Sequence, residues 1–339
     1  MLTKEKMNNV DKTRIYEIYD NWPEIAENAL NGNFEEMIKE DISHIVFAGM
    51  GGSGTIGDVF ASVLSKTDIH VDVVKGYHLP KTVKKNSLLI CTSVSGNTIE
   101  TITVLKEGIE LGCKIIVFSS NGKMKEICKN KKIEHREIIM NHSPRASFVG
   151  YLYSMIKVLL PILPISNKDV INSIDELKIT KEKINSLNLN DDNVSLNIAK
   201  WIKNIPIIYY PWGLQSVAIR FKNSLHENSK MHVMIDDVIE SCHNGIVSWK
   251  NNSTLQPILI EGENDYIKTK ERWLIIKEIF QEKNIPFYEV KSNNGNILSK
   301  LTQLIYMLDY SSIYLAILNN IDPTPVLAID LIKNKLKKL

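Results

Sequence analysis

The chain reads IVFAGMGGSG from Ile45 to Gly54, and this stretch decides the fold. Its first four residues are β-branched, aromatic or small, as expected of a buried strand. The glycines that follow let the backbone turn sharply and approach a ligand closely. A helical stretch then runs from Thr55 to Leu64. A strand, a glycine-rich turn and a helix in this order indicate an α/β sheet whose ligand-binding edge lies at the turn.

The same alternation continues through the first half of the chain. Further strands are predicted at residues 71–74, 87–92, 114–119 and 133–139, with a helix at residues 98–111. Short apolar runs bounded by turn residues and separated by helices indicate a mainly parallel sheet that helices cover on both faces. The sequence therefore predicts an α/β fold.

A second alternating set follows a polar stretch at residues 165–193, which we interpret as a helical or loop connection between domains. Its predicted strands and helices lie at residues 205–211, 214–225, 256–261, 266–282, 286–290, 296–319 and 326–338. In both halves a strand leads through a glycine-containing turn into a helix, which indicates a duplicated domain. The length of 339 residues suits two domains, predicted at residues 1–163 and 164–339.

Composition excludes several classes of protein. The net charge of +2 is nearly balanced, which gives no sign of a nucleic-acid or membrane partner. The four cysteines are scattered without C-x-x-C spacing, which argues against a zinc site and a disulfide framework and suits a reducing cytosol. The longest apolar run, residues 151–165, is interrupted by Lys157, Pro161 and Pro164 and is too short to span a bilayer. Because the chain also begins without the apolar core of a signal peptide, we expect a cytoplasmic protein.

A second loop, reading SVSGNT from Ser93 to Thr98, also lies between a predicted strand and a predicted helix. The hydroxyls of Ser93, Ser95 and Thr98, with the backbone amides of a helix start, form a phosphate cradle that needs no lysine. The alternative is an ordinary helix cap supplied by Ser95 or Thr98. One hydroxyl suffices for a cap, so three around a glycine favour phosphate.

The glycine loop at residues 49–54 has a dinucleotide site as its alternative. Its spacing departs from G-x-G-x-x-G. The only acidic candidate for a ribose contact, Asp72, lies inside a predicted strand. Both features disfavour a nucleotide.

The two loops, GMGGS at residues 49–53 and SVSGNTIET at residues 93–101, resemble the sugar isomerase (SIS) domain, a flavodoxin-like module that holds sugar phosphates. The resemblance continues with four further segments, PRASF at 144–148, HENSK at 226–230, HN at 243–244 and DPTPV at 322–326. In this order they are similar to the bifunctional phosphoglucose/phosphomannose isomerases of archaea and some bacteria, over nearly the whole chain. The resemblance implies two SIS domains, a hexose 6-phosphate substrate, a homodimer and a step of glycolysis and gluconeogenesis.

The resemblance also implies roles for single residues. The phosphate-binding positions of the family match Gly52, Ser53, Ser93, Ser95 and Thr98. The catalytic positions match Arg145, Glu227, His243 and Lys333. In the family, the arginine stabilises an enediolate and the glutamate moves a proton between C2 and C1. The histidine assists ring opening from the partner subunit, and the lysine near the C-terminus also acts in ring opening.

The chemistry requires these residue types independently of the family. Isomerisation removes a weakly acidic proton beside a carbonyl, which a positioned carboxylate can accept while a fixed cation offsets the charge that develops on the oxygens. Ring opening moves a proton between two oxygens, which suits histidine near neutral pH. No metal or redox cofactor is needed, and the sequence offers no ligand cluster for one.

Each catalytic residue has a structural alternative. Glu227 and Lys333 lie among polar residues and could be solvent-exposed, and Arg145 could pair with a carboxylate. His243 could be a hydrogen-bonded structural histidine, and its rival His226 is set aside because Glu227 fixes the register of the motif.

The sequence also departs from the family pattern. Gly245 replaces the usual Glu after His-Asn, Val94 replaces an aromatic residue, and Ser248 stands where glycine is common. Two other functions therefore stay open. One is another enzyme on the same fold, an aminosugar isomerase or a deglycase, and the other is a non-catalytic sugar-phosphate sensor.

Overall fold

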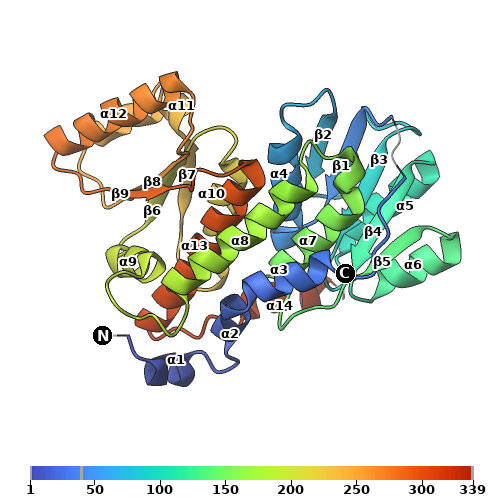
Figure 1. Ribbon diagram of the computed structural model, residues 1–339, viewed down its shortest axis with the longest axis horizontal. Helices are drawn as coiled ribbons and strands as arrows, with labels where there is room; N and C mark the ends of the chain where they lie inside the picture. Colours follow the sequence, from blue (N-terminus) through green and yellow to red (C-terminus); the bar gives the residue numbers. More distant parts are fainter. Residues whose placement is uncertain (1, 39–40, 337–339) are drawn as a thin grey trace.

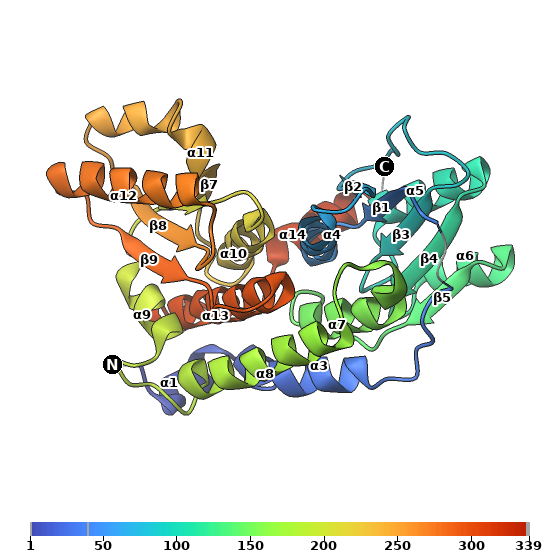
Figure 2. The same cartoon turned by 45° about the horizontal axis from the view of Figure 1, so that its top comes forward.

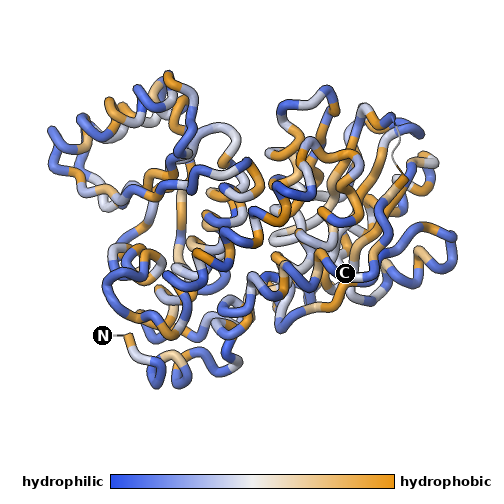
Figure 3. The backbone as a smooth tube through the Cα atoms, in the orientation of Figure 1, coloured by the Kyte–Doolittle hydropathy of each residue, from blue (hydrophilic) through white to orange (hydrophobic). Residues whose placement is uncertain are grey.

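A computed structural model describes residues 2–38 and 41–336, which form two lobes joined by long helices (Figure 1). Each lobe holds one parallel β-sheet with helices around it. The α/β prediction is therefore confirmed. Hydrophobic residues gather along the strands and the joining helices, whereas the outer helices and loops are largely hydrophilic (Figure 3).

The first sheet contains five parallel strands in the order β2-β1-β3-β4-β5. The strands are β1 (His44–Ala48), β2 (His70–Val74), β3 (Leu88–Thr92), β4 (Lys114–Ser119) and β5 (Glu134–Glu137). The helices of this lobe are α4 (Gly51–Leu64), α5 (Ile99–Leu111), α6 (Lys123–Lys131) and α7 (Phe148–Leu159), which continues into η1 (Leu160–Ile162). All five strands match predicted ones. The polar α6 and the almost wholly buried α7 were not predicted.

The second sheet contains four parallel strands in the order β7-β6-β8-β9. The strands are β6 (Pro206–Tyr210), β7 (Met234–Asp237), β8 (Gln256–Glu261) and β9 (Tyr288–Lys291). The helical segments of this lobe are α9 (Val194–Trp201), α10 (Gln215–Glu227), α11 (Val238–Ser241), η2 (Gly245–Lys250) and α12 (Ile267–Glu282). In each sheet the first strand of the lobe lies between the second and the third. The two lobes thus share one topology, as a duplicated domain predicts.

Long helices lie between and beneath the two sheets (Figure 2). The polar stretch predicted as a connection forms α8 (Asn167–Ile184), which starts with a reciprocal cap between Ser166 and Asp169 and packs on α13 (Ile297–Leu318). The N-terminal helices were not predicted: α1 (Lys4–Val10), α2 (Ile15–Asp20) and α3 (Trp22–Leu30). They lie against α13, α8 and α7, and the Tyr306 hydroxyl on α13 donates to the Tyr19 carbonyl oxygen at 2.7 Å.

Two helices near the C-terminus contrast sharply in burial. Within the described part of the chain, α13 is the one helix long and apolar enough to cross a membrane, and 89% of that apolar window is buried inside the fold. By contrast, α14 (Leu327–Leu336) has no buried residue, although it carries several leucines and isoleucines. Its predicted end at Lys338 lies outside the described residues.

Candidate active site

The helices that follow the first strand of each lobe, α4 and α10, pack against each other and run antiparallel. The Asn223 side-chain amide donates to Thr55 Oγ1 at 3.3 Å, and the hydroxyls of Ser62 and Ser216 lie 3.4 Å apart. Residue numbers therefore rise along α4 as they fall along α10. This register brings the start of α4, at Gly51, to the same end of the pair as Glu227, the last residue of α10.

Arg145 ties this end of the helix pair to the segment that follows α13. It is 5% exposed, and its Nε donates to the Asn228 side-chain oxygen at 2.7 Å. Its Nη2 donates to the carbonyl oxygens of Pro323 and Thr324 at 2.7 and 2.9 Å. The remaining nitrogen, Nη1, lies 3.6 Å from Glu227 Oε2. Because three hydrogen bonds hold the guanidinium, its Nη1 edge is presented to Glu227 in a fixed orientation.

A second buried arginine, Arg220 on α10, supports the first. Its Nε and Nη2 both donate to Asp309 Oδ2 on α13, at 2.8 and 2.6 Å, and Nη2 also donates to the Arg145 carbonyl oxygen at 2.9 Å. The guanidinium carbon lies 4.4 Å from the centre of the Phe148 ring. Burial raises the pKa of Asp309 above its ordinary value, and the hydrogen bonds from Arg220 and Ser224 oppose that rise.

The third nitrogen of Arg220 lies at the glycine loop. A Cβ atom placed on Gly52 would lie 3.0 Å from Arg220 Nη1 and 4.0 Å from Arg145 Cα. Glycine at this position therefore leaves room for a guanidinium beside the first turn of α4. The start of α4 and the Arg145 guanidinium together favour a negative charge at this end of the helix pair, while Asp309 balances the charge of Arg220.

Glu227 is half-buried in this setting, with its side chain 26% exposed. The neighbouring Lys230 donates from Nζ to the carbonyl oxygens of Glu227 and Pro323. Burial, and next to it the positive charge of Arg145, lower the pKa of Lys230 below its ordinary value. Asn228 holds Arg145 and donates in turn to the Ser312 hydroxyl at 2.8 Å, so the motif after α10 is fixed on both sides.

The hydroxyl loop follows β3, which pairs directly with β1, so it lies beside the glycine loop at the carboxyl edge of the sheet. Ser93 Oγ and Thr98 Oγ1 lie 2.9 Å apart, and Ser95 Oγ accepts from the Asn97 amide at 3.3 Å. Thr98 is the cap residue of α5, yet its side chain makes no hydrogen bond to the helix amides. The capping alternative therefore does not account for Thr98. A Cβ on Gly96, whose φ is +65°, would lie 1.6 Å from the Asn121 carbonyl oxygen, so only glycine fits there.

Comparison with known proteins supports one family for the whole chain. Residues 37–162 match the SIS domain model, and residues 191–336 match the model of the bacterial phospho-glucose isomerase C-terminal SIS domain. The bifunctional phosphoglucose/phosphomannose isomerase of Aquifex aeolicus is 32% identical over 299 residues, which cover 87% of this chain and 90% of that protein. The chain belongs to the bifunctional phosphoglucose/phosphomannose isomerase family. The resemblance seen in the sequence is thereby confirmed, and so is the prediction of two SIS domains.

Other relatives agree with this assignment. The family member of Caldicellulosiruptor bescii is 31% identical over 340 residues, covering 96% of this chain and 99% of that protein. Among solved structures, a hypothetical protein from Thermus thermophilus has a TM-score of 0.71 at 12% identity, covering 99% of this chain and 89% of that one. The C-terminal domain of glucosamine-fructose-6-phosphate aminotransferase from Francisella tularensis has a TM-score of 0.67 at 16% identity, with coverages of 92% and 98%. At these identities the solved structures show the fold alone.

Two residues that the family resemblance implies lie apart from this cluster within one chain. His243 follows α11, and its side chain is exposed. Lys333 is exposed on α14. Within residues 2–38 and 41–336, no hydrogen bond or ion pair joins either side chain to Arg145 or Glu227. The rival His226 is partly buried, and burial lowers its pKa below the ordinary value.

The departure at Gly245 has a local reason in this chain. A Cβ at this position would lie 2.9 Å from Asp236 Oδ2 and 3.4 Å from Ser241 Cβ. Any larger residue at this position would therefore begin in close contact with the Asp236 carboxylate, whose pKa is raised by burial. Glycine avoids this close contact.

Sequence reasoning missed the supporting groups Arg220, Asp309 and Asn228. For Arg220, a charged residue amid apolar ones was a usable signal. Asp309 gave the same signal as the only acidic residue of the apolar α13. Their pairing joins residues 89 positions apart, which no local pattern reveals.

Proposed function

We propose that this protein interconverts glucose 6-phosphate and fructose 6-phosphate, and also converts mannose 6-phosphate, by proton transfer through a cis-enediolate. The observation that carries the proposal is the antiparallel packing of α4 on α10. It gathers a glycine-rich helix start, the fixed cation of Arg145 and the carboxylate of Glu227 at one end of the helix pair. Family membership points to the same chemistry.

The phosphate group binds at the two neighbouring loops of the first lobe. Backbone amides at the starts of α4 and α5 face it, and the helix dipoles favour its negative charge. The hydroxyls of Ser53, Ser93, Ser95 and Thr98 donate the remaining hydrogen bonds, while Gly52 lets the phosphate approach the backbone. A phosphate held this way leaves the carbonyl end of the open sugar free to extend toward Glu227.

Glu227 acts as the base that takes the proton from C2 or C1 and returns it to the other carbon. The negative charge that then develops on the sugar oxygens faces the Nη1 edge of Arg145. Because the other donors of Arg145 are already committed to Asn228, Pro323 and Thr324, the cation needs no reorganisation when this charge appears. Rotation of the enediolate about its C2–C3 bond lets the proton return to either face of C2, which yields glucose or mannose 6-phosphate.

Ring opening uses His243 of a second copy of the chain, with Lys333 assisting. Two features support a homodimer. The side chain of His243 is exposed, and within the described residues no hydrogen bond or ion pair joins it to Glu227, which suits a histidine that serves the site of another chain. The helix α14 exposes 77% of Leu327, 56% of Leu331 and 59% of Ile332, an apolar surface that a second copy would cover.

We also propose a cytoplasmic location, because the cysteines are free and the proposed substrate is a sugar phosphate.

Coupled assays with glucose, fructose and mannose 6-phosphates test the proposal. The wild-type protein turns over all three, and Glu227→Gln loses about 10²- to 10⁴-fold in turnover, as expected when a general base is removed. Absence of turnover with all three hexose phosphates would overturn the function. Near-normal turnover by Glu227→Gln would overturn only the choice of base.

A second candidate is an enzyme acting on an aminosugar phosphate. The D-glucosamine-6-phosphate 4-epimerase of Sulfolobus acidocaldarius is 28% identical over 263 residues, covering 77% of this chain and 81% of that protein. The change at Gly245 also alters the segment beside His243. The same assays with glucosamine 6-phosphate separate the candidates, because a preference for the aminosugar would favour the second. A non-catalytic sensor is disfavoured, since such a protein has no need of Arg145 held against Glu227.

A further inference from the structure

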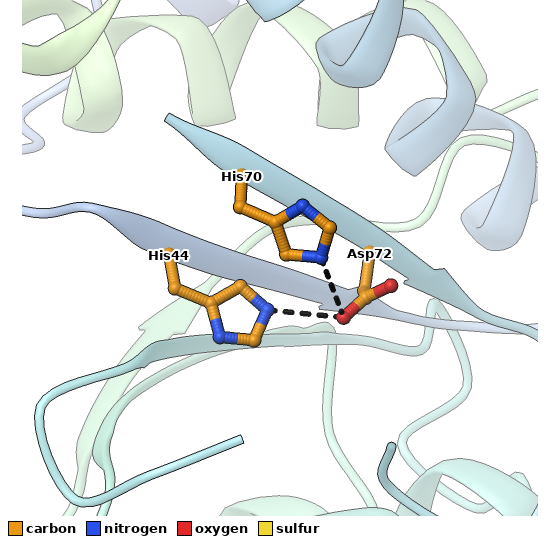
Figure 4. Close-up of side chains that lie close together, drawn as sticks. All are labelled: His44, His70 and Asp72. Atoms are coloured by element: carbon orange, nitrogen blue, oxygen red, sulfur yellow. Dashed lines mark hydrogen bonds and ion pairs between the residues drawn. The ribbon is translucent and has the colours of Figure 1, made fainter. Parts of the chain in front are cut away.

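Three metal-ligating side chains converge at the start of the first sheet, away from the site described above. His44 begins β1, and His70 and Asp72 lie on the neighbouring edge strand β2. The parallel register places His44 opposite His70 and Val46 opposite Asp72, so all three side chains share one face. Figure 4 shows both imidazoles directed at the same carboxylate oxygen.

The spacing of these atoms suits a metal ion. His44 Nε2 lies 3.0 Å and His70 Nε2 3.5 Å from Asp72 Oδ2, and the three ligand atoms all lie within 4.8 Å of one another. Tetrahedral Zn²⁺ with bonds of about 2.0–2.1 Å holds its ligand atoms roughly 3.4 Å apart. The two measured distances lie on either side of that value. The His70 side chain is 61% exposed, so its ring can rotate to bring Nε2 nearer to the other two ligand atoms.

The surroundings fix the inner histidine. His44 Nδ1 lies 3.0 Å from Ser87 Oγ, which also accepts from the Lys84 amide at 2.9 Å. A hydrogen bond at Nδ1 directs Nε2 toward Asp72, as outer-sphere partners do for metal-binding histidines. Only 11% of the His44 side chain is exposed, whereas the His70 side is open to water. One side of the cluster is thus preorganised, and the other leaves a coordination position for water.

We propose that His44, His70 and Asp72 bind one divalent transition-metal ion, with Zn²⁺ the ion that this ligand set suits best. Two imidazoles and one carboxylate are typical zinc ligands. The site lies at the amino ends of β1 and β2, whereas the glycine loop follows the carboxyl end of β1. The ion therefore clips the edge strand β2 to β1 and takes no part in isomerisation. Without an ion, His44 Nε2 is hydrogen-bonded to Asp72 Oδ2, and His70 Nε2 lies at ion-pair distance from the same oxygen.

Sequence reasoning found no ligand cluster because His44 lies 26 residues before His70 in the chain. The pair His70-x-Asp72 was visible, but two ligands at alternate strand positions are common without a metal. Only the register of β1 and β2 supplies the third ligand.

Zinc titration of the full-length, chelator-treated protein tests the proposal. Calorimetry is expected to show one saturable site, and Co²⁺ is expected to give visible absorption bands without a thiolate charge-transfer band. Asp72→Asn and His70→Gln should each weaken binding by more than about tenfold. His78→Gln is the matched control, because His78 lies in the same lobe with 84% of its side chain exposed and is outside the cluster.

Zn²⁺ should also raise the thermal unfolding midpoint of the wild type and of His78→Gln, but not of Asp72→Asn. If Asp72→Asn does not fold, the same measurement is made with His70→Gln, whose substitution is at an exposed position, and Zn²⁺ should again leave the unfolding midpoint unchanged. Binding that is unsaturable, or equally tight in both ligand variants, would overturn the site. Isomerase turnover should be equal with and without Zn²⁺, so this outcome is independent of the proposed function.

Discussion

The two ends of the α4–α10 helix pair arise from the same duplicated scaffold and carry different chemistry. One end brings the start of α4 together with Glu227, beside Arg145 and Arg220. At the other end, the hydroxyls of Ser62 and Ser216 meet at 3.4 Å, a contact with no charge. Antiparallel packing makes this difference useful, because a helix start attracts phosphate while the end of the neighbouring helix can present a carboxylate. Duplication thus provides two equivalent ends of the helix pair. Only one of them, called the Glu227 end below, combines a glycine-rich helix start with Arg145 and Glu227.

The largest expected effect comes from breaking the buried ion pair between Arg220 and Asp309, which lies next to Arg145 at the Glu227 end of the helix pair. Asp309→Asn leaves the Arg220 guanidinium buried without its counter-charge, which should lower the free energy of unfolding by about 3–5 kcal/mol. Urea unfolding followed by circular dichroism measures the change. A loss below about 1 kcal/mol would show that the ion pair between α10 and α13 contributes little to stability.

Replacing the fixed cation should affect catalysis next most strongly. Arg145→Lys loses the planar fork that donates to Asn228, Pro323 and Thr324, so the cation near Glu227 is no longer fixed. Turnover should fall about 10²- to 10³-fold, with a smaller change in KM. Steady-state kinetics with fructose 6-phosphate provide the check, and a change confined to KM would assign Arg145 to binding alone.

A methyl group at the glycine loop should have a moderate effect. Gly52→Ala places a Cβ 3.0 Å from Arg220 Nη1, so either the loop or the guanidinium must shift. We expect kcat/KM to fall roughly tenfold or more, since small displacements in a catalytic site are costly. Gly76→Ala is the control, because a Cβ there meets no atom within 4 Å. Equal kinetics for the two variants would contradict the placement of phosphate at this loop.

The smallest effect is expected at the other end of the helix pair. Ser216→Ala removes one long hydrogen bond and should cost less than about 1 kcal/mol of stability, with turnover unchanged. A loss of turnover at this position, without a loss of stability, would mean that the second end also participates in function.

The sequence predicted the parts of the molecule that depend on local patterns. The two loops, the duplicated unit and eight of the nine strands in the described residues follow from apolar runs and glycine positions, whereas the short polar strand β7 was not predicted. The N-terminal helices, the Arg220–Asp309 pair and the cluster of His44, His70 and Asp72 depend on contacts between distant segments. The roles of His243 and Lys333 stay predictions, because no hydrogen bond or ion pair within the described residues joins either side chain to Glu227.

The central claim is that Glu227 moves the proton between C2 and C1 of the sugar. Proton exchange with solvent tests this claim most directly. When fructose 6-phosphate is incubated with the wild-type protein in heavy water, NMR spectroscopy should detect deuterium at C1 of the ketose and at C2 of the aldoses. Glu227→Gln should abolish this incorporation, while Ser216→Ala leaves it at the wild-type rate. Incorporation at an undiminished rate by Glu227→Gln would contradict the account.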